Sequence, residues 1–323
     1  MNTARILDYQ LSSIGGFEEI VVDELGAVVG GRIQGLRVEH GEVGGVYFRT
    51  EASPRRLLQL GCPTAIEAVA AQAHDVTVGQ PGLERVLRCL RSLPVAAVRR
   101  LAKACDEGVD VDHVELRVTL RGAHRFVAAD VERLALPALH ELGFQENPPP
   151  PGFRAMPLTI RVRKRRAFVT VLLGPRRPVG DPQREGWPGP ARNCVSRVLD
   201  LDDELVVGGL PAPGGSGLSI AASDIVASAE HLPLRTGRLP VLLLVYDLDT
   251  HSAVDQLREA VRAVAPGGIL GLLVRRSEQL AGLLHELELP LEVMATIPYY
   301  VRRRRCVLFL LERLELLSIE SMT

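Results

Sequence analysis

Hydrophobic and polar residues alternate with two different periods in the first 64 residues. Ile6–Ser12 has the apolar character of a short strand, whereas Phe17–Leu25 has apolar residues at helical spacing. Arg32–Glu39 and Gly44–Thr50 alternate apolar and polar residues on either side of a short turn, which predicts a hairpin. Ser53-Pro54 then favours the start of a short helix, with serine as N-cap. These elements predict a small α+β unit.

The stretch from residue 65 to residue 173 continues the mixture of strands and helices. Apolar runs and alternating segments predict strands over Ile66–Val78, Val114–Leu120, Leu158–Val162 and Ala167–Leu173. Helical spacing predicts helices over Leu83–Leu93, Val95–Asp106 and Ala129–Leu142. The last two strands are expected to form a hairpin whose tip is Arg163-Lys164-Arg165-Arg166.

Residues 175–190 are rich in proline, glycine and arginine, and this composition predicts a domain boundary. Beyond it, strands alternate with helices, which predicts a mostly parallel sheet. The expected strands are Leu205–Leu210, Ser219–Ile225, Val241–Tyr246, Ile269–Val274, Leu291–Val301 and Arg305–Leu314, and the expected helices are Val254–Val264 and Glu278–Leu287. The final pair of strands is expected to be an antiparallel hairpin. The fold class is therefore α/β and α+β.

Composition sets the broad class of protein. A chain of 323 residues with 46% hydrophobic and 24% charged residues is expected to fold as two or three domains. No apolar run approaches the ~20 residues of a membrane helix, and the N-terminus does not resemble a signal peptide. The five cysteines form no C-x-x-C pair, and this spacing argues against both a disulfide framework and a metal site. These features predict a cytoplasmic protein without a membrane partner.

Charge is distributed unevenly along the chain. Residues 61–180 contain 18 lysines and arginines and 12 acidic residues, while both flanking regions are acidic. A basic middle region indicates a polyanionic partner, although a solvated basic surface has the same composition. Three basic clusters stand out, namely Arg85/Arg88/Arg91, Arg121/His124/Arg125 and Arg161–Arg166 followed by Arg176-Arg177. With only 4% aromatic residues, recognition is expected to depend on shape and backbone more than on base stacking.

The order of elements in residues 1–175 resembles the THUMP family of RNA-binding modules. Gly16-Phe17-Glu18 is similar to the opening of the ferredoxin-like domain that precedes THUMP, and Val118–Phe126 is similar to the strand–turn segment of THUMP itself. The resemblance implies a ferredoxin-like domain over 1–64 and a THUMP domain over 65–175. It also implies structured RNA as partner, either the tRNA acceptor region or an rRNA helix, and no DNA. The expected RNA contacts are Arg85, Arg88, Arg121, His124, Arg125, Arg163, Lys164, Arg165 and Arg166.

After a linker over 176–197, residues 198–323 resemble a shortened, Rossmann-like class I methyltransferase domain. Ser223-Asp224-Ile225 and Ala229–Leu234 are similar to the segments that hold the ribose and adenine of S-adenosylmethionine. Val264–Leu270 is similar to the turn before the fifth strand of that family. An active member would therefore be expected to bind this cofactor through Gly215, Gly217, Asp224 and Glu230.

Two departures from the family pattern argue against catalysis. Pro211 stands where the family has an acidic residue, and the spacing from Gly217 to Asp224 leaves no room for a full helix and a strand. Where amino-methylating members carry Asn-Pro-Pro-Tyr, this chain reads Val245-Tyr246-Asp247-Leu248, which leaves Asp247 as the candidate to accept a hydrogen bond from an amine.

Three hypotheses follow from the sequence. The first is an RNA-binding pseudoenzyme that combines THUMP with a degenerate methyltransferase-like domain and needs no cofactor. The second is an S-adenosylmethionine-dependent RNA methyltransferase of the guanine-N2 type with a divergent active site. The third is an assembly subunit whose C-terminal sheet docks a protein partner. The shared fold alone does not decide among these hypotheses.

Overall fold

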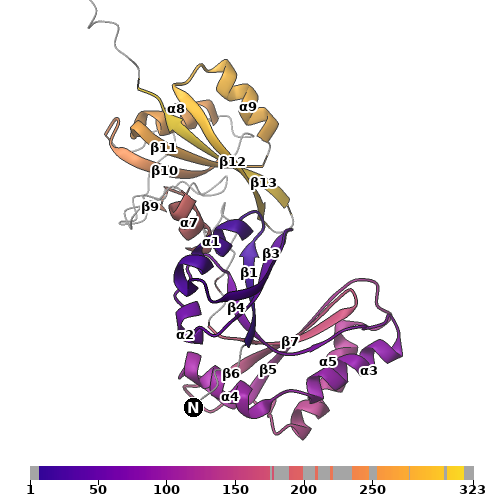
Figure 1. Cartoon of the computed structure of the whole chain (residues 1–323). Coiled ribbons are helices and arrows are strands. Elements are labelled where there is room, and N and C mark those ends of the chain that lie inside the picture. The colour runs from indigo at the N-terminus through magenta and orange to yellow at the C-terminus, as the bar shows by residue number, and fades with distance from the viewer. Residues whose placement is uncertain are drawn as a thin grey trace, which may run out of the picture. The chain divides into compact units, whose positions relative to one another are not determined.

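A computed structural model describes residues 7–174, 177, 189–198, 208–209, 219–220, 235–246, 253–275, 277–301 and 304–315 (Figure 1). The chain divides into two compact units. The first contains residues 1–12, 22–38 and 45–176, and the second contains residues 13–21, 39–44 and 177–323. Two short segments near the N-terminus therefore belong to the same unit as the C-terminal half of the chain.

The described strands of the N-terminal half form one seven-stranded sheet in the order β2-β3-β1-β4-β7-β6-β5. These strands are β1 (Leu7–Ile14), β2 (Ile33–Glu39), β3 (Val43–Thr50), β4 (Ala65–Ala73), β5 (Val109–Arg121), β6 (Arg154–Arg163) and β7 (Arg166–Leu172). Strand β5 is parallel to β6, whereas β4 is antiparallel to both β1 and β7, and β6 is antiparallel to β7. The sheet therefore continues across the expected domain boundary at residue 64.

Three helices pack against the β4 to β5 side of this sheet, and two others lie in the N-terminal part. The packed helices are α3 (Gln80–Arg91), α4 (Val95–Cys105) and α5 (Ala128–Glu141), and the others are α1 (Glu18–Val29) and α2 (Pro54–Leu57). Every second residue of the strands points to these helices, so that Leu116, Leu158 and Val169 join one apolar core with Val86 and Leu139. Because α3, α4 and α5 all pack against this core, the opposite face of β5, β6 and β7 is left for polar residues (Figure 1).

The second unit contains a four-stranded sheet in the order β10-β11-β13-β12. Its strands are β10 (Leu239–Tyr246), β11 (Val264–Val274), β12 (Leu291–Val301) and β13 (Arg304–Arg313), and its helices are α7 (Gly189–Val198), α8 (Ala253–Ala263) and α9 (Ser277–Glu286). Strands β10 and β11 are parallel, while β13 is antiparallel to β11 and β12. Two further short strands, β8 (Gly208–Gly209) and β9 (Ser219–Ile220), pair with each other. Buried apolar residues of β10, β11, α8 and α9 form the core.

The N-terminal segments of the second unit pack tightly against strand β12. The Phe17 and Tyr299 rings meet edge to face, with centroids 5.4 Å apart, and both side chains are fully buried. Gly16 has φ of +97°, and a Cβ at this position would lie 1.6 Å from the carbonyl oxygen of Pro298. The Glu18 carboxylate accepts a hydrogen bond from the Gly16 N–H at 2.9 Å. Glycine at position 16 is thus required by both its conformation and its surroundings.

The fold class expected from the sequence is confirmed, including the antiparallel C-terminal hairpin. Several details differ. Strand β4 ends at Ala73, because the chain turns at Asp75, whose φ is +60°. Ser53 precedes α2 but makes no side-chain capping hydrogen bond. Helix α7 overlaps the segment 176–197 that was expected to be a linker, and the described part of the second sheet is mixed instead of mostly parallel.

Three further features of the described residues concern membrane-spanning helices, metal ligands and thiol groups. Across the described ranges, no helix has the length and apolar character needed to cross a membrane. The same residues contain no cluster of histidine, cysteine and acidic side chains suited to a metal ion. Burial raises the pKa of the Cys89 and Cys105 thiols to about 11, so that both remain protonated at neutral pH.

Candidate nucleic-acid interface

The face of β5, β6 and β7 opposite the helices, here called the open face, carries a dense set of polar side chains. Cross-strand neighbours share a face, so the strand register aligns them in rows. One row is Arg121–Arg163–Arg166 and the next is Thr119–Arg161–Phe168. The open face comprises Glu115, Arg117, Thr119, Arg121, Pro157, Thr159, Arg161, Arg163, Arg166, Phe168, Thr170 and Leu172.

Tyr47 of strand β3 reaches the same region from the N-terminal part of the sheet. Its hydroxyl oxygen accepts a hydrogen bond from Arg163 Nη1 at 3.4 Å, and its ring centroid lies 6.4 Å from that of Phe168. The Arg37 guanidinium stacks over the Tyr47 ring, with Cζ 4.5 Å from the centroid. Strands β1 and β4 separate β3 from β7, so in a flat sheet the two strands would lie about 14 Å apart. The twist of the sheet brings these side chains together.

We call this region the arginine corner, defined by Arg37, Tyr47, Arg121, Arg161, Arg163, Arg166 and Phe168. The electrostatics of Tyr47 reflect its position there. Burial raises the pKa of the Tyr47 hydroxyl, and the positive charges of Arg161, Arg37 and Arg121 partly oppose this increase. Several guanidinium groups thus surround one aromatic pair, an arrangement suited to phosphate groups and adjacent bases.

A buried carboxylate lies beneath the arginine corner. Glu67 of β4 has no exposed surface, and its oxygens lie 2.6 and 2.7 Å from Nη2 of Arg161, whose side chain is 21% exposed. Removing one partner of such a pair leaves a buried charge uncompensated, which typically costs about 3–5 kcal/mol. The pair therefore holds Arg161 in one orientation.

The structure places the arginines expected from the sequence on different parts of the first unit. Arg121, Arg163 and Arg166 meet in one row of the open face. Arg85 and Arg88 lie on the exposed side of α3, which covers the opposite face of the sheet. These two arginines are therefore separated from the arginine corner by the sheet itself.

The remaining expected contacts lie at the end of the hairpin and in the loop before α5. Lys164 occupies the hairpin turn with φ of +52°, and Arg165 forms an ion pair with Asp75 at 3.1 Å. The Arg125 N–H donates to the Val78 carbonyl, which fixes the loop. The His124 ring packs against Phe126 at 5.0 Å, and its two buried nitrogens have no hydrogen-bond partner among the described residues.

Sequence reasoning missed Arg37, Tyr47 and Phe168 because it grouped charges along the chain. Arg37 and Tyr47 belong to a net acidic segment, and Phe168 is a single aromatic residue in an apolar strand. The alternation of side chains along the hairpin could have indicated this grouping. Its core residues alternate with Arg161, Arg163, Arg166 and Phe168, which therefore share the opposite face.

The cofactor and catalytic candidates Gly215, Gly217, Asp224, Glu230 and Asp247 all lie outside the described residues. The described part of the second unit does contain strands β10 and β11. Strand β10 ends at Tyr246, directly before Asp247, and lies beside β11 at the edge of the described sheet. The turn expected over Val264–Leu270 forms the irregular start of β11, where the register shifts between Leu239 and Val241.

No protein-family model matches this chain, and no curated protein matches its sequence. Solved structures match over almost its whole length. TrmN from Thermus thermophilus superposes with a TM-score of 0.63 at 18% identity, covering 95% of this chain and all of that one. SMU.472, a methyltransferase-type protein in complex with SAH, gives 0.56 at 12% identity over 96% of this chain and 99% of its own.

A third match is a protein from Listeria monocytogenes named for a predicted N6-adenine-specific DNA methylase activity. It gives a TM-score of 0.52 at 12% identity, covering 95% of this chain and 96% of that one. This chain has a methyltransferase-type fold. At these identities the similarity establishes the fold, and it extends through both units.

Proposed function

We propose that this protein binds structured RNA through the arginine corner and the adjoining open face. The observation that carries the proposal is the convergence of Arg121, Arg163 and Arg166 with Arg37 and the Tyr47–Phe168 pair. Arginines that neutralise phosphates release counterions, and this release supplies much of the affinity for nucleic acids. Guanidinium groups bind phosphate oxygens through two hydrogen bonds, so a rigid set of them recognises backbone geometry.

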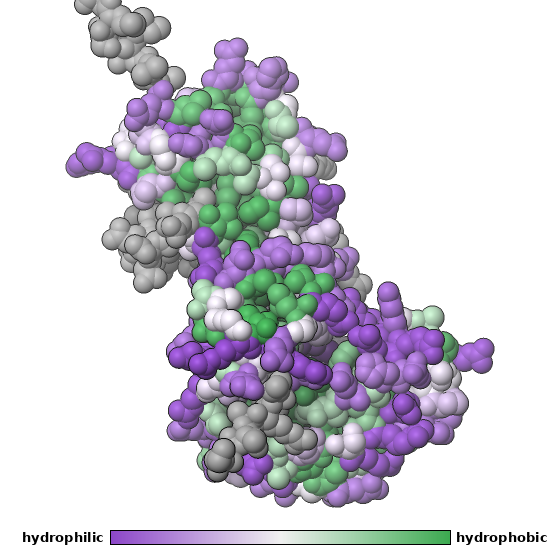
Figure 2. All heavy atoms as spheres, in the orientation of Figure 1, coloured by the Kyte–Doolittle hydropathy of each residue, from purple (hydrophilic) through white to green (hydrophobic). Residues whose placement is uncertain are grey.

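The sheet gives these cations the rigidity that backbone recognition requires. The corner residues project from paired strands, and buried Glu67 fixes Arg161 from beneath. Figure 2 shows mainly hydrophilic residues on the first unit near the β6–β7 hairpin, whose strands carry Arg163 and Arg166. Together with the resemblance of residues 1–175 to THUMP, these features favour a tRNA acceptor region or an rRNA helix as the bound RNA.

For the second unit, we propose a scaffold role without catalysis. Strand β10 pairs in parallel with β11, as expected for the fourth and fifth strands of the methyltransferase fold. The sequence that follows β10 is Asp247-Leu248-Asp249, without the Asn-Pro-Pro-Tyr motif that grips a target amine. Pro211 stands where the methyltransferase family has an acidic residue, and this difference supports the same proposal.

A second candidate is S-adenosylmethionine-dependent methylation of RNA. Two observations favour it: the SAH bound to SMU.472, and the match to TrmN across all of that chain. In this case Gly215, Gly217, Asp224 and Glu230 would hold the cofactor, and Asp247 would accept a hydrogen bond from the target amine.

Calorimetric titration of the full chain with a tRNA transcript, and separately with S-adenosylmethionine, tests both candidates. We expect binding of the tRNA and no saturable heat from the cofactor up to about millimolar concentration, which corresponds to roughly −4 kcal/mol. Cofactor binding near micromolar, about −8 kcal/mol, would replace the scaffold proposal with the methylation candidate. Absence of tRNA binding at low salt would contradict the RNA proposal.

A further inference from the structure

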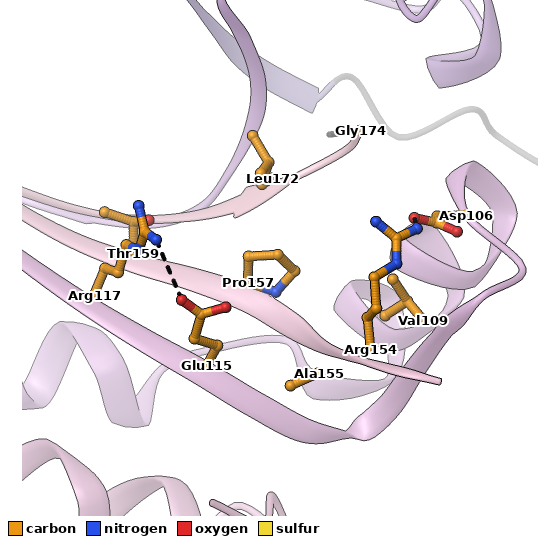
Figure 3. Close-up of a pocket in the computed structure, with 10 residues that line it drawn as sticks. All are labelled: Asp106, Val109, Glu115, Arg117, Arg154, Ala155, Pro157, Thr159, Leu172 and Gly174. Carbon is orange, nitrogen blue, oxygen red and sulfur yellow. Dashed lines mark hydrogen bonds and ion pairs between the residues drawn. The ribbon is translucent and has the colours of Figure 1, made fainter. Parts of the chain in front are cut away.

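A hollow of about 440 Å³ opens on the same face of the sheet as the arginine corner, but at the other end of the strands (Figure 3). It is lined by Asp106, Val109, Glu115, Arg117, Arg154, Ala155, Pro157, Thr159, Leu172 and Gly174. Glu115 and Pro157 are cross-strand neighbours six residues before the Arg121–Arg163 pair. At about 3.3 Å per residue, the hollow lies roughly 20 Å from the arginine corner.

The floor of the hollow is apolar. Pro157 lies at its centre, between two ion pairs, and Ala155, Val109 and Leu172 extend the apolar surface (Figure 3). A concave site of about 300–1,000 Å³ with an apolar floor and a few polar groups is typical of small-molecule sites. The aliphatic face of the proline ring and the leucine side chain can pack against a planar ligand.

The rim of the hollow is polar but balanced in charge. The Glu115 and Arg117 side chains form one ion pair at 3.3 Å, and Asp106 and Arg154 form another at 2.5 Å on the opposite side. The charges of the two carboxylates and the two guanidinium groups cancel, whereas the arginine corner is cationic. The net charge of the hollow therefore does not favour an isolated phosphate. Glu115 and Arg117 are 57% and 55% exposed, and an exposed pair of this kind costs at most about 1 kcal/mol to rearrange around a ligand.

We infer that this hollow binds an unpaired guanine base, with Glu115 and Arg117 reading its edge and Pro157 supporting its face. Guanine presents two adjacent donors, N1–H and N2–H, next to two adjacent acceptors, O6 and N7. A carboxylate can accept from both donors, while a neighbouring guanidinium donates to both acceptors. Adenine, cytosine and uracil lack this combination of two donors beside two acceptors.

This inference rests on the proposed RNA binding and deepens it. The arginine corner would hold the backbone of a structured RNA, which carries no sequence information, and the hollow would select the base of an unpaired nucleotide. Strands β5 and β6 run from the hollow to the arginine corner, so both sites are held on one continuous sheet.

The test uses the full chain and free ribonucleotides, so that it does not depend on RNA binding at the arginine corner. Titration with GMP, IMP, AMP, CMP and UMP is followed by calorimetry or by NMR shifts of the nucleotide. GMP is expected to bind about tenfold more tightly than AMP, CMP or UMP, since one bidentate pair contributes about 1–3 kcal/mol of discrimination. IMP, which lacks the N2 amino group, is expected to fall between GMP and AMP.

Glu115→Gln is expected to reduce GMP affinity about tenfold and to remove the preference over IMP. The matched control is Glu141→Gln, which makes the same charge change in an exposed pair with Arg91 at 3.5 Å on the helix side. The inference is overturned if GMP and AMP bind equally, if no nucleotide binds, or if both variants behave alike. Each of these results leaves the RNA proposal intact, because that proposal fails only if tRNA binding itself is absent.

Discussion

Replacing both Arg121 and Arg166 with alanine is expected to weaken binding of a tRNA transcript about 30- to 100-fold. Both side chains are exposed at the arginine corner and flank Arg163 in one row of the open face. This loss corresponds to about 2–2.7 kcal/mol, or about 1–1.4 kcal/mol for each of the two lost phosphate contacts, which lies within the net contribution of about 0.5–1.5 kcal/mol that is typical of one hydrogen bond. Filter binding over a series of salt concentrations should also show a slope smaller by about two.

The control for this prediction is the pair Arg85→Ala and Arg88→Ala. It removes the same charge from the same unit, but on α3, which covers the other face of the sheet. We expect this pair to reduce affinity at most about threefold, because the two lost charges lower the overall positive potential of the unit without removing a direct contact. Equal losses from the two double variants would show that the arginine corner is not the principal contact surface.

The second large effect concerns the packing of the N-terminal segments in the second unit. Phe17→Ala is expected to lower the free energy of unfolding of that unit by about 3–5 kcal/mol, the usual range for removing a buried phenylalanine. The loss includes the edge-to-face contact with Tyr299, because such pairs contribute about 0.5–1.5 kcal/mol beyond burial. Urea unfolding followed by circular dichroism gives the measurement.

Phe153→Ala is the matched control for Phe17→Ala. The Phe153 side chain is 50% exposed, and a substitution at such a position usually changes stability by about 0.5 kcal/mol or less. If the two variants unfold at the same urea concentration, residues 13–21 contribute nothing to the core of the second unit.

The helices and strands could be predicted from the sequence because their periods are clear. Alternation in Leu158–Val162 and Ala167–Leu173 indicated the β6–β7 hairpin, and helical spacing indicated α3, α4 and α5. The end of a strand could not be predicted where the turn depends on the conformation of one residue, as at Asp75 after β4. Periodicity along a segment indicates which of its residues face a core, and this pattern can be read from the segment alone.

The composition of the candidate interface could be predicted only in part. Sequence reasoning identified Arg121, Arg163 and Arg166, but it joined them to Arg85 and Arg88, which lie on the other side of the sheet. Whether two clusters share a face depends on the order of the strands in the sheet. This order is set by contacts between distant segments, so the pattern within one segment does not reveal it. Tyr47 meets Phe168 only because the sheet continues through β1 and β4 and twists.

Long-range packing also determines the role of Gly16-Phe17. The sequence resemblance assigned these residues to an N-terminal ferredoxin-like domain, whereas the structure packs them against Pro298 and Tyr299. The contact joins Phe17 to Tyr299, which are 282 positions apart in the sequence, so no local pattern could have indicated it. It explains why residues 13–21 belong to the second unit.

Ultraviolet cross-linking of the full chain to a tRNA transcript, followed by mass spectrometry of the cross-linked peptides, tests the central proposal most directly. Tyr47 and Phe168 lie among the arginines of the corner and are the aromatic residues best placed to react. Cross-links in the peptides that carry these two residues are the expected result. Cross-links restricted to α3 or to the second unit would contradict the proposal.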